Sequence, residues 1–306
     1  MLRALFIGLS TNKPLRSFAE NNSLGRRMSH RFVAGESVED LIAATEAVNK
    51  QGIHVTVDNL GENVTNREEA LHSAKLYHCL LDEIEKRKLD ANVSLKLTHM
   101  GLDVDEQLAK GIVSELLDHA VQINSFIRID MEDSSYTQKT IDFTRQLHNR
   151  PGYQGRVGTV LQAYMKRTEA DAKLLCSEGI RIRLCKGAYR EPAEVAIQDK
   201  RDVDANYVKV AKQIIKSGVF HGIATHDENI VNELKAWSKA EGIPKSAFEF
   251  QMLHGIRRDL QQQLASEGWG VRIYIPFGTE WYPYFMRRLA ERPANVIFIA
   301  KNLLRS

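Results

Sequence analysis

The chain has 306 residues, of which 43% are hydrophobic and 26% are charged, so it is long enough to bury a large core. Its 42 Lys and Arg against 39 Asp and Glu leave a net charge of +3, which disfavours a nucleic-acid partner or an anionic membrane surface and favours a small-molecule site. The three cysteines include no CxxC pair and fit the reducing cytoplasm, and no apolar stretch approaches the roughly 20 residues of a membrane span.

The first 50 residues are expected to form a helical arm. They begin with MLRALFIGLS, whose apolar run is too short for a signal peptide and is interpreted as mature structure. Further on, SVEDLIAATEAVNKQ has a helical period, and Ser37 stands where an N-terminal cap belongs. We therefore expect a single catalytic domain over 1–306, in which an arm over 1–50 precedes a barrel over 51–306.

Short runs rich in β-branched residues recur along the rest of the chain. Each run ends in polar residues and is followed by a longer amphipathic stretch, which is the alternation expected of a parallel sheet. Eight such units favour an α/β fold of the closed (βα)8 TIM-like barrel type, with extra N-terminal helices. The eight expected strands are HVTVD from His54, NVSLKLT from Asn92, FIRIDME from Phe126, VGTVLQA from Val157, RIRLCKG from Arg181, HGIATHD from His221, FEFQML from Phe248 and VRIYIPF from Val271.

An open dinucleotide-binding sheet is a weaker interpretation. Its phosphate loop would follow the first strand as GxGxxG, whereas DNLGENVT offers one glycine. The helical stretches between the strands carry clear apolar stripes. In NREEALHSAKLYHCLLDEIEKRK the stripe consists of Ala70, Leu71, Ala74, Tyr77, Leu80, Leu81 and Ile84.

Polar residues at the carboxyl ends of barrel strands point into the active-site mouth. Charged side chains among apolar strand residues are costly to bury unless they are paired or used. Taken singly, these charges fit structural ion pairs inside the barrel; together, they suggest a site for a ligand with carboxylate or phosphate groups. The strand-end set is Asp58, Lys96, Asp130, Glu132, Gln162, Arg183, Lys186, Thr225, His226, Asp227, Gln251 and Tyr274.

One more polar group follows the last strand, in FGTEWYPYFMRRLAERP. Tyr284, Arg287, Arg288 and Glu291 stand at i, i+3, i+4 and i+7 and share one helix face. A solvated surface with a Glu291 to Arg287 pair would explain them on an average helix. This helix, however, begins next to the expected mouth.

An ordered set of motifs, about one for each strand from the second onward, resembles the proline dehydrogenase family over most of the chain. The motifs are SLKLTHMGLD, IRIDMEDS, VLQAY, RLCKGAYRE, ATHD, EFQMLHG and YIPFGTEWYPYFMRRLAERPAN. The resemblance implies a distorted (βα)8 barrel with FAD at the carboxyl ends of the strands and L-proline stacked against the flavin.

The resemblance also implies roles residue by residue, with no metal ion. Asp130 and Arg183 match active-site positions. The expected substrate-binding residues are Lys96, Tyr274, Tyr284, Arg287, Arg288 and Glu291. The expected FAD contacts are Met131, Gln162, Arg183, Lys186, Gly187, Ala188, Thr225 and His226.

The implied reaction is hydride transfer from the proline ring carbon next to nitrogen to flavin N5, giving 1-pyrroline-5-carboxylate, the first step of proline catabolism to glutamate. The implied electron acceptor is a quinone, and a separate pyrroline-5-carboxylate dehydrogenase would take the product. The enzyme would be cytoplasmic, with peripheral contact at the inner face of the membrane through its apolar N-terminus or the C-terminal NVIFIAKNLLRS. At these lengths a packed helix or strand explains both segments better.

Three other functions stay open from the residues alone. Lys96 or Lys186 would serve an aldolase-like barrel as a Schiff-base nucleophile. A flavin barrel of the methylenetetrahydrofolate reductase type would bind FAD without oxidising proline. A non-catalytic module would bind an anion without redox change.

Overall fold

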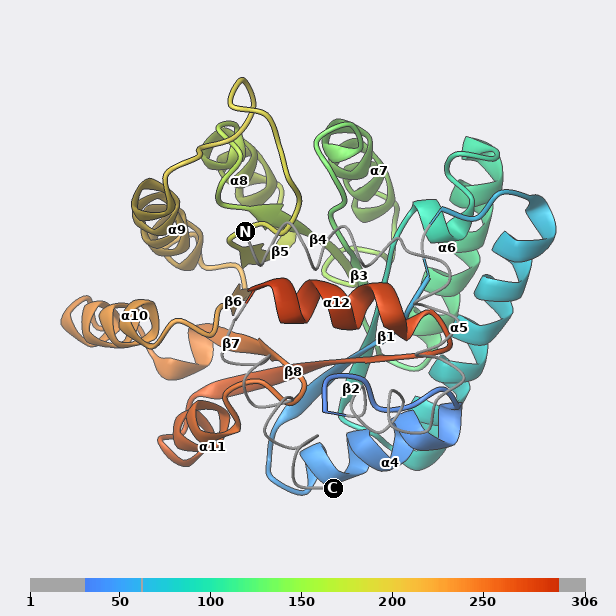
Figure 1. Ribbon diagram of the computed structural model, residues 1–306, viewed down its shortest axis with the longest axis horizontal. Coiled ribbons are helices and arrows are strands. Elements are labelled where there is room, and N and C mark those ends of the chain that lie inside the picture. The colour runs from blue at the N-terminus through green and yellow to red at the C-terminus, as the bar shows by residue number, and fades with distance from the viewer. Residues whose placement is uncertain (1–30, 62, 292–306) are drawn as a thin grey trace.

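The computed structural model describes residues 31–61 and 63–291, with side chains described as far as Met286. Within this part the eight expected strands form a closed parallel barrel in chain order, which confirms the predicted fold class (Figure 1). Most of the strands end before the polar motif residues, which lie at the ends of the strands or just beyond them. The strands are β1 (His54–Asn59), β2 (Ala91–Leu95), β3 (Ile127–Ile129), β4 (Val157–Gln162), β5 (Arg181–Cys185), β6 (His221–Ala224), β7 (Phe248–Leu253) and β8 (Gly270–Phe277).

Helices follow the strands and form the outer layer of the barrel (Figure 1). Two short 3-10 helices, η1 (Thr98–Met100) and η2 (Lys245–Ala247), interrupt the connections. The α-helices are α4 (Val38–Asn49), α5 (Arg67–Arg87), α6 (Glu106–Gln122), α7 (Thr137–His148), α8 (Thr168–Ser177), α9 (Lys200–Ile215), α10 (Glu228–Ala240), α11 (Arg258–Ser266) and α12 (Trp281–Glu291).

The inside of the barrel contains many polar side chains. Residues of alternate parity on each strand are apolar and buried in one large core with the helices, whereas the other parity carries charged and amide side chains. Two glycines make room for this polar filling: a Cβ on Gly158 would stand 2.8 Å from Nη1 of Arg128, and one on Gly222 would stand 2.2 Å from Nε2 of Gln251. The strand glycines are therefore required by side chains of the adjacent strands.

Two layers of buried charge result from this filling. The base layer, near the amino ends of the strands, consists of Arg128, Glu249 and Arg272. The mouth layer, near the carboxyl ends, consists of Asp58, Lys96, Asp130, Arg183 and Tyr274.

The helix after β8 leaves the outer layer. The first half of α12 packs in an apolar cluster with Phe32, Leu60 and Ile256, and the latter two follow the carboxyl ends of β1 and β7. In Figure 1, α12 crosses in front of the strands. The outer faces of β1 and β8 are covered instead by α4. This exchange departs from the regular alternation of a (βα)8 barrel, and it places α12 at the mouth.

The expected arm is described only from residue 31 onward. Its helix α4 begins after Ser37, whose hydroxyl accepts from the backbone N–H of Asp40 in a capping box, as predicted. The division into arm and barrel stays a prediction. One residue of the expected α5 stripe is wrong: Leu71 is 45% exposed, and Ser73 is buried in its place. Ser73 and Ala74 both lie on the buried face of α5, so that face is rotated slightly from the predicted one.

Candidate active site

Asp130 stands at the centre of the mouth layer. Its Oδ1 accepts hydrogen bonds from Oγ of Ser94 at 2.6 Å and from Nη1 of Arg183 at 2.7 Å, and its Oδ2 accepts from the hydroxyl of Tyr274 at 3.0 Å. These partners come from β2, β5 and β8, while Asp130 follows β3. The strands β5 and β8 are not neighbours of β3 and can exchange such contacts with it only through the barrel interior, so Asp130, Arg183 and Tyr274 point inward. Ser94 points inward as well, because its Oγ accepts from Nη1 of Arg183 at 3.3 Å, across non-neighbouring strands.

Arg183 ties this carboxylate to the wall of the barrel. Its Nε donates to Oε1 of Gln251 at 2.7 Å, and its guanidinium lies over the ring of Tyr274, 5.1 Å from the centroid. Burial, followed by the charge of Asp130, raises the pKa of the Tyr274 hydroxyl well above its ordinary value. Tyr274 is therefore a neutral hydrogen-bond donor at any physiological pH.

Lys96 and Asp58 form the other half of the mouth layer. Nζ of Lys96 lies 3.8 Å from Oδ2 of Asp58, and both side chains are buried to a large extent. The hydroxyl of Tyr77, on α5, donates to Ser94 O at 2.9 Å and reaches Oδ1 of Asp58 at 3.3 Å. A carboxylate this near favours the charged ammonium, which is the wrong state for a Schiff-base nucleophile.

The carboxyl ends of β4, β5 and β6 form a neighbouring arc with a different donor set. The side-chain amide of Gln162 donates to Glu132 O at 2.9 Å, and the Lys186 ammonium contacts Asp227 at 2.9 Å and Asp204 at 2.5 Å. An ammonium has three N–H donors, so two carboxylates leave one for a further anion. Both carboxylates hold the Lys186 side chain at the position of an anion ligand, which argues against the Schiff-base alternative there too.

His226 lies on this arc in one defined tautomer. Its Nε2 accepts a hydrogen bond from the backbone N–H of Leu253 at 2.9 Å. The neutral ring must then carry its proton on Nδ1 and can only donate from that side. The hydroxyl of Thr225 accepts from the backbone N–H of Asp227 at 3.1 Å, which shapes the turn between β6 and α10.

The backbone after β5 can be built only with glycine. Gly187 has a φ of 115°, and a Cβ there would stand 1.8 Å from the ring of Tyr164. Met131 is buried behind this arc, while Ala188 is exposed at its edge. The expected FAD contacts thus lie on consecutive strand ends, from β3 to β6.

The helix α12 supplies one described member of the expected substrate set. Tyr284 is 7% exposed and lies in the apolar cluster with Phe32, Ile256 and Phe285. The side chains of Arg287, Arg288 and Glu291 lie outside the described residues, as do the N-terminal and C-terminal segments considered for membrane contact. Their expected roles stay predictions.

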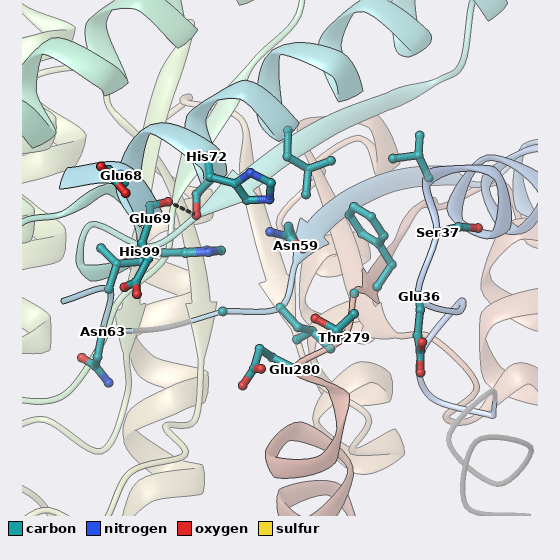
Figure 2. A pocket seen from close by; sticks show the side chains of 18 residues that line it. Glu36, Ser37, Asn59, Asn63, Glu68, Glu69, His72, His99, Thr279 and Glu280 are labelled. Atoms are coloured by element: carbon teal, nitrogen blue, oxygen red, sulfur yellow. Dashed lines mark hydrogen bonds between the residues drawn. The ribbon is translucent and has the colours of Figure 1, made fainter. Parts of the chain in front are cut away.

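A cavity of about 950 Å³ opens on the outer side of the β1 and β8 ends, between α4 and α5 (Figure 2). Asn59 and His99 extend into it, and acidic side chains such as Glu69 and Glu280 lie on its edge. Burial, followed by the charge of Lys96, lowers the pKa of His99 to about 4, so this ring is neutral near pH 7. The cavity lies across the barrel from the β4–β6 arc.

Sequence reasoning placed Asp58 and Gln251 at strand ends but gave them no role, and it did not select Ser94 or Tyr77. Ser94 has the inward parity of Asn92 and Lys96 on the same strand, which is the signal that would have found it. No such signal exists for Tyr77, because a helix stripe does not show which strand residue its hydroxyl will meet.

Taken together, the mouth offers cations from β2 and β5, carboxylates from β1 and β3 and a neutral phenol from β8. This set can bind and orient a small carboxylate. Among the described residues, no group of three His, Cys, Asp or Glu side chains is arranged to hold a metal ion. No helix in that part of the chain is long and apolar enough to cross a membrane.

Comparison with known proteins agrees with these observations. A family model described as proline dehydrogenase matches residues 41–301. Proline dehydrogenase 1 of Bacillus subtilis subsp. natto is 40% identical over 306 residues, covering all of both chains, and the proline dehydrogenase of Deinococcus radiodurans is 41% identical over 281 residues, covering 91% of this chain and 90% of its own.

Larger proteins match over a part of their length. The bifunctional PutA of Escherichia coli is 26% identical over 317 residues, which cover 90% of this chain and 24% of PutA. Among solved structures, proline utilization A of Bdellovibrio bacteriovorus, inactivated by N-propargylglycine, superimposes with a TM-score of 0.82 at 25% identity, over 87% of this chain and 33% of that one.

Proposed function

The chain belongs to the proline dehydrogenase family and oxidises proline to 1-pyrroline-5-carboxylate, and from that premise we propose which part of the barrel mouth binds proline and which part binds the cofactor. The ends of β8, β1 and β2, with α12, bind L-proline. The ends of β3 to β6 bind FAD. The observation that carries this division is the convergence of Lys96, Asp130, Arg183 and Tyr274 at one end of the barrel.

On the substrate side, Lys96 binds the proline carboxylate together with Arg287 and Arg288 of α12, and Glu291 orients the two arginines. Tyr274 and Tyr284 form the walls around the ring. This assignment is supported by the position of Lys96 at the mouth and by the path of α12 across it. A charged clamp with rigid walls fixes the ring carbon next to nitrogen, which is the orientation that oxidation requires.

On the cofactor side, the residues fit FAD by the chemistry of their donors. Gln162, Lys186, Thr225 and His226 offer an amide, an ammonium, a hydroxyl and an imidazole from consecutive strands. Met131, Gly187 and Ala188 complete the set, and the backbone at Gly187 approaches the ring of Tyr164 more closely than any side chain would allow. Arg183, between the two sides, contacts FAD and belongs with Asp130 to the active site.

Bound FAD supplies the acceptor for the hydride that leaves the proline ring. The protein's own residues hold the substrate and set its protonation. Free proline carries an ammonium, and the cationic side chains of Lys96 and the two arginines disfavour that positive charge in the pocket. We therefore expect turnover to rise with pH through the ionisation of bound proline. A flat rate from neutral to alkaline pH would exclude this role.

The visible spectrum of the purified enzyme tests the proposal. An absorbance band near 450 nm that bleaches on anaerobic addition of L-proline establishes cofactor and reaction together. Arg145→Gln, on the outer helix α7 where the guanidinium pairs with Glu178, is a matched control and should bleach like the wild type. A flavin that proline leaves oxidised would contradict the substrate assignment, and a protein that cannot be loaded with FAD would contradict the cofactor.

The electrons then pass to a quinone, and a separate pyrroline-5-carboxylate dehydrogenase takes the product. The second point follows from the family resemblance; the bifunctional PutA matches this chain over 24% of its own length. Reoxidation of the proline-reduced enzyme by a short-chain quinone, followed by return of the 450 nm band, tests the first point. No return of the band would exclude the quinone.

A further inference from the structure

Asp58 is a buried titratable group to which the proposed function assigns no role. It ends the inward-facing series of β1, and its side chain is 1% exposed. Four titratable groups face it from four elements: Lys96 from β2, Asp130 from β3, Tyr274 from β8 and Tyr77 from α5. Any role of Asp58 must therefore act through one of these neighbours.

The charges of these four groups show which one balances the Asp58 carboxylate. Asp130 already accepts a charge-assisted hydrogen bond from Arg183 at 2.7 Å. Tyr77 and Tyr274 are both neutral, because burial raises the pKa of each hydroxyl well above its ordinary value. Lys96 is therefore the cation that balances Asp58.

This pair is looser than the other buried ion pairs of the barrel. Oδ2 of Asp58 and Nζ of Lys96 are 3.8 Å apart, whereas Arg272 and Glu249 are 2.6 Å apart and Arg183 and Asp130 are 2.7 Å apart. Within the described part of the chain, Oδ2 of Asp58 accepts no hydrogen bond. The pair is held by charge rather than by a formed hydrogen bond, so the ammonium can be transferred to another carboxylate.

We propose that Asp58 is a positioning residue for the oxidation of proline: its carboxylate keeps the Lys96 ammonium charged and in place in the free enzyme, and releases it to the substrate carboxylate. The inference rests on the proposed function, which makes Lys96 a substrate-binding residue. Burial, with a further contribution from Asp130, raises the pKa of Asp58 to about 6, against the opposing charge of Lys96. Asp58 can thus become neutral by taking up a proton when the ammonium turns to the substrate.

Removing the carboxylate should reveal this role as a change with pH. In Asp58→Asn, the Lys96 ammonium has lost the charge of the Asp58 carboxylate and gives up its proton at lower pH than in the wild type. The ratio of KM for proline in the variant to KM in the wild type should be near one at pH 7. It should rise to about tenfold at pH 9.5, the factor that one pH unit of lost protonation gives.

A double-mutant cycle shows whether Asp58 acts through Lys96. Lys96→Met should raise KM by about tenfold or more at every pH, because a charge-assisted contact with the carboxylate is lost. Adding Asp58→Asn to Lys96→Met should then change KM no further, and the pH dependence of the ratio should vanish. Glu85→Gln, a carboxylate-to-amide change on the exposed surface of α5, is the matched control and should follow the wild type throughout.

The outcomes separate the inference from the function on which it rests. The role of Asp58 would be overturned if the ratio of KM in Asp58→Asn to KM in the wild type did not change with pH. It would also be overturned if the double variant raised KM by the product of the factors for Asp58→Asn and Lys96→Met. A Lys96→Met enzyme with the KM of the wild type would instead overturn the substrate assignment of Lys96. If Asp58→Asn does not fold, Asp58→Ser, which leaves room for water, replaces it in the cycle with the same expected results.

Discussion

Glu249 in the base layer and Asp58 in the mouth layer are buried carboxylates of the same barrel, and their surroundings act on them in opposite directions. Burial alone would raise the pKa of Glu249, but the charge and hydrogen bond of Arg272, with Gln251, lower it instead. For Asp58 burial prevails, and the pKa rises to about 6 despite Lys96. The partners of Glu249 thus outweigh the cost of its burial, whereas those of Asp58 do not, at the end of the barrel where a ligand arrives.

The partners of the two layers explain the difference. In the base layer, Nη1 of Arg128 donates to the carbonyls of Thr159 and Arg181, and Nη1 of Arg272 donates to Val55 O at 2.7 Å. Carbonyls of a closed barrel cannot move, so these charges are locked. In the mouth layer the charges bind one another's side chains, which can exchange partners. Fixed charges stabilise the barrel, and exchangeable ones suit binding and catalysis.

The largest expected effect is on stability in the base layer. Glu249→Gln leaves the Arg272 guanidinium buried without its counter-ion, so the free energy of unfolding should fall by about 3 to 5 kcal/mol. Urea denaturation followed by far-UV circular dichroism measures this change. A loss below about 1 kcal/mol would show that the base layer is no more locked than the mouth.

Acid should destabilise the fold through two buried histidines, one near Arg128 of the base layer and one near Lys96 of the mouth layer. Burial, followed by nearby cations, lowers the pKa of His221 to about 3 and that of His99 to about 4. The unfolded chain binds these protons near pH 6.5 and the folded chain does not, so stability falls as pH drops from 6.5 toward 4, by up to about 3 kcal/mol for each group.

The urea midpoint between pH 7 and pH 4.5 checks this prediction. His99→Gln, which carries no titrating ring beside Lys96, should show a shallower fall than the wild type. Equal slopes in the two proteins would mean that His99 is not held neutral in the folded state.

In the mouth layer, function should be more sensitive than stability. Tyr274→Phe removes the hydrogen bond to Oδ2 of Asp130 but keeps the ring under Arg183. We expect kcat/KM to fall about tenfold, and the free energy of unfolding by about 1 kcal/mol. Steady-state kinetics with proline, paired with urea titrations, measure both. A variant of normal kcat/KM and strongly reduced stability would reverse the assignment of the two layers.

The smallest effect on stability is expected at Asp58 itself. Because its folded-state pKa is raised, folding works against the ionised carboxylate above about pH 6. At pH 8, Asp58→Asn removes the cost of burying the ionised carboxylate but also takes its charge from Lys96, so the two effects oppose each other and the free energy of unfolding should change by no more than about 1 kcal/mol. A loss as large as that of Glu249→Gln would show that both layers are structural.

Local sequence patterns were sufficient to predict the barrel and the residues at its mouth. Eight β-rich runs separated by helical stripes predicted the barrel, because the parity of a strand and the period of a helix are set by neighbouring residues alone. The motif residues at strand ends were placed at the mouth for the same reason. Parity does not say, however, which strand lies opposite across the barrel.

The hydrogen-bond and ion-pair partners of the mouth residues depend on the closure of the barrel. Asp130 meets Tyr274 and Arg183 because closure brings β3, β5 and β8 around one interior, although 144 residues separate the first pair along the chain. The cover of β1 and β8 by α4, which frees α12 for the mouth, and the loose pair of Asp58 with Lys96 also depend on contacts between distant segments. A sequence specifies which side chains face inward, but the charge that each one meets there is a property of the assembled barrel.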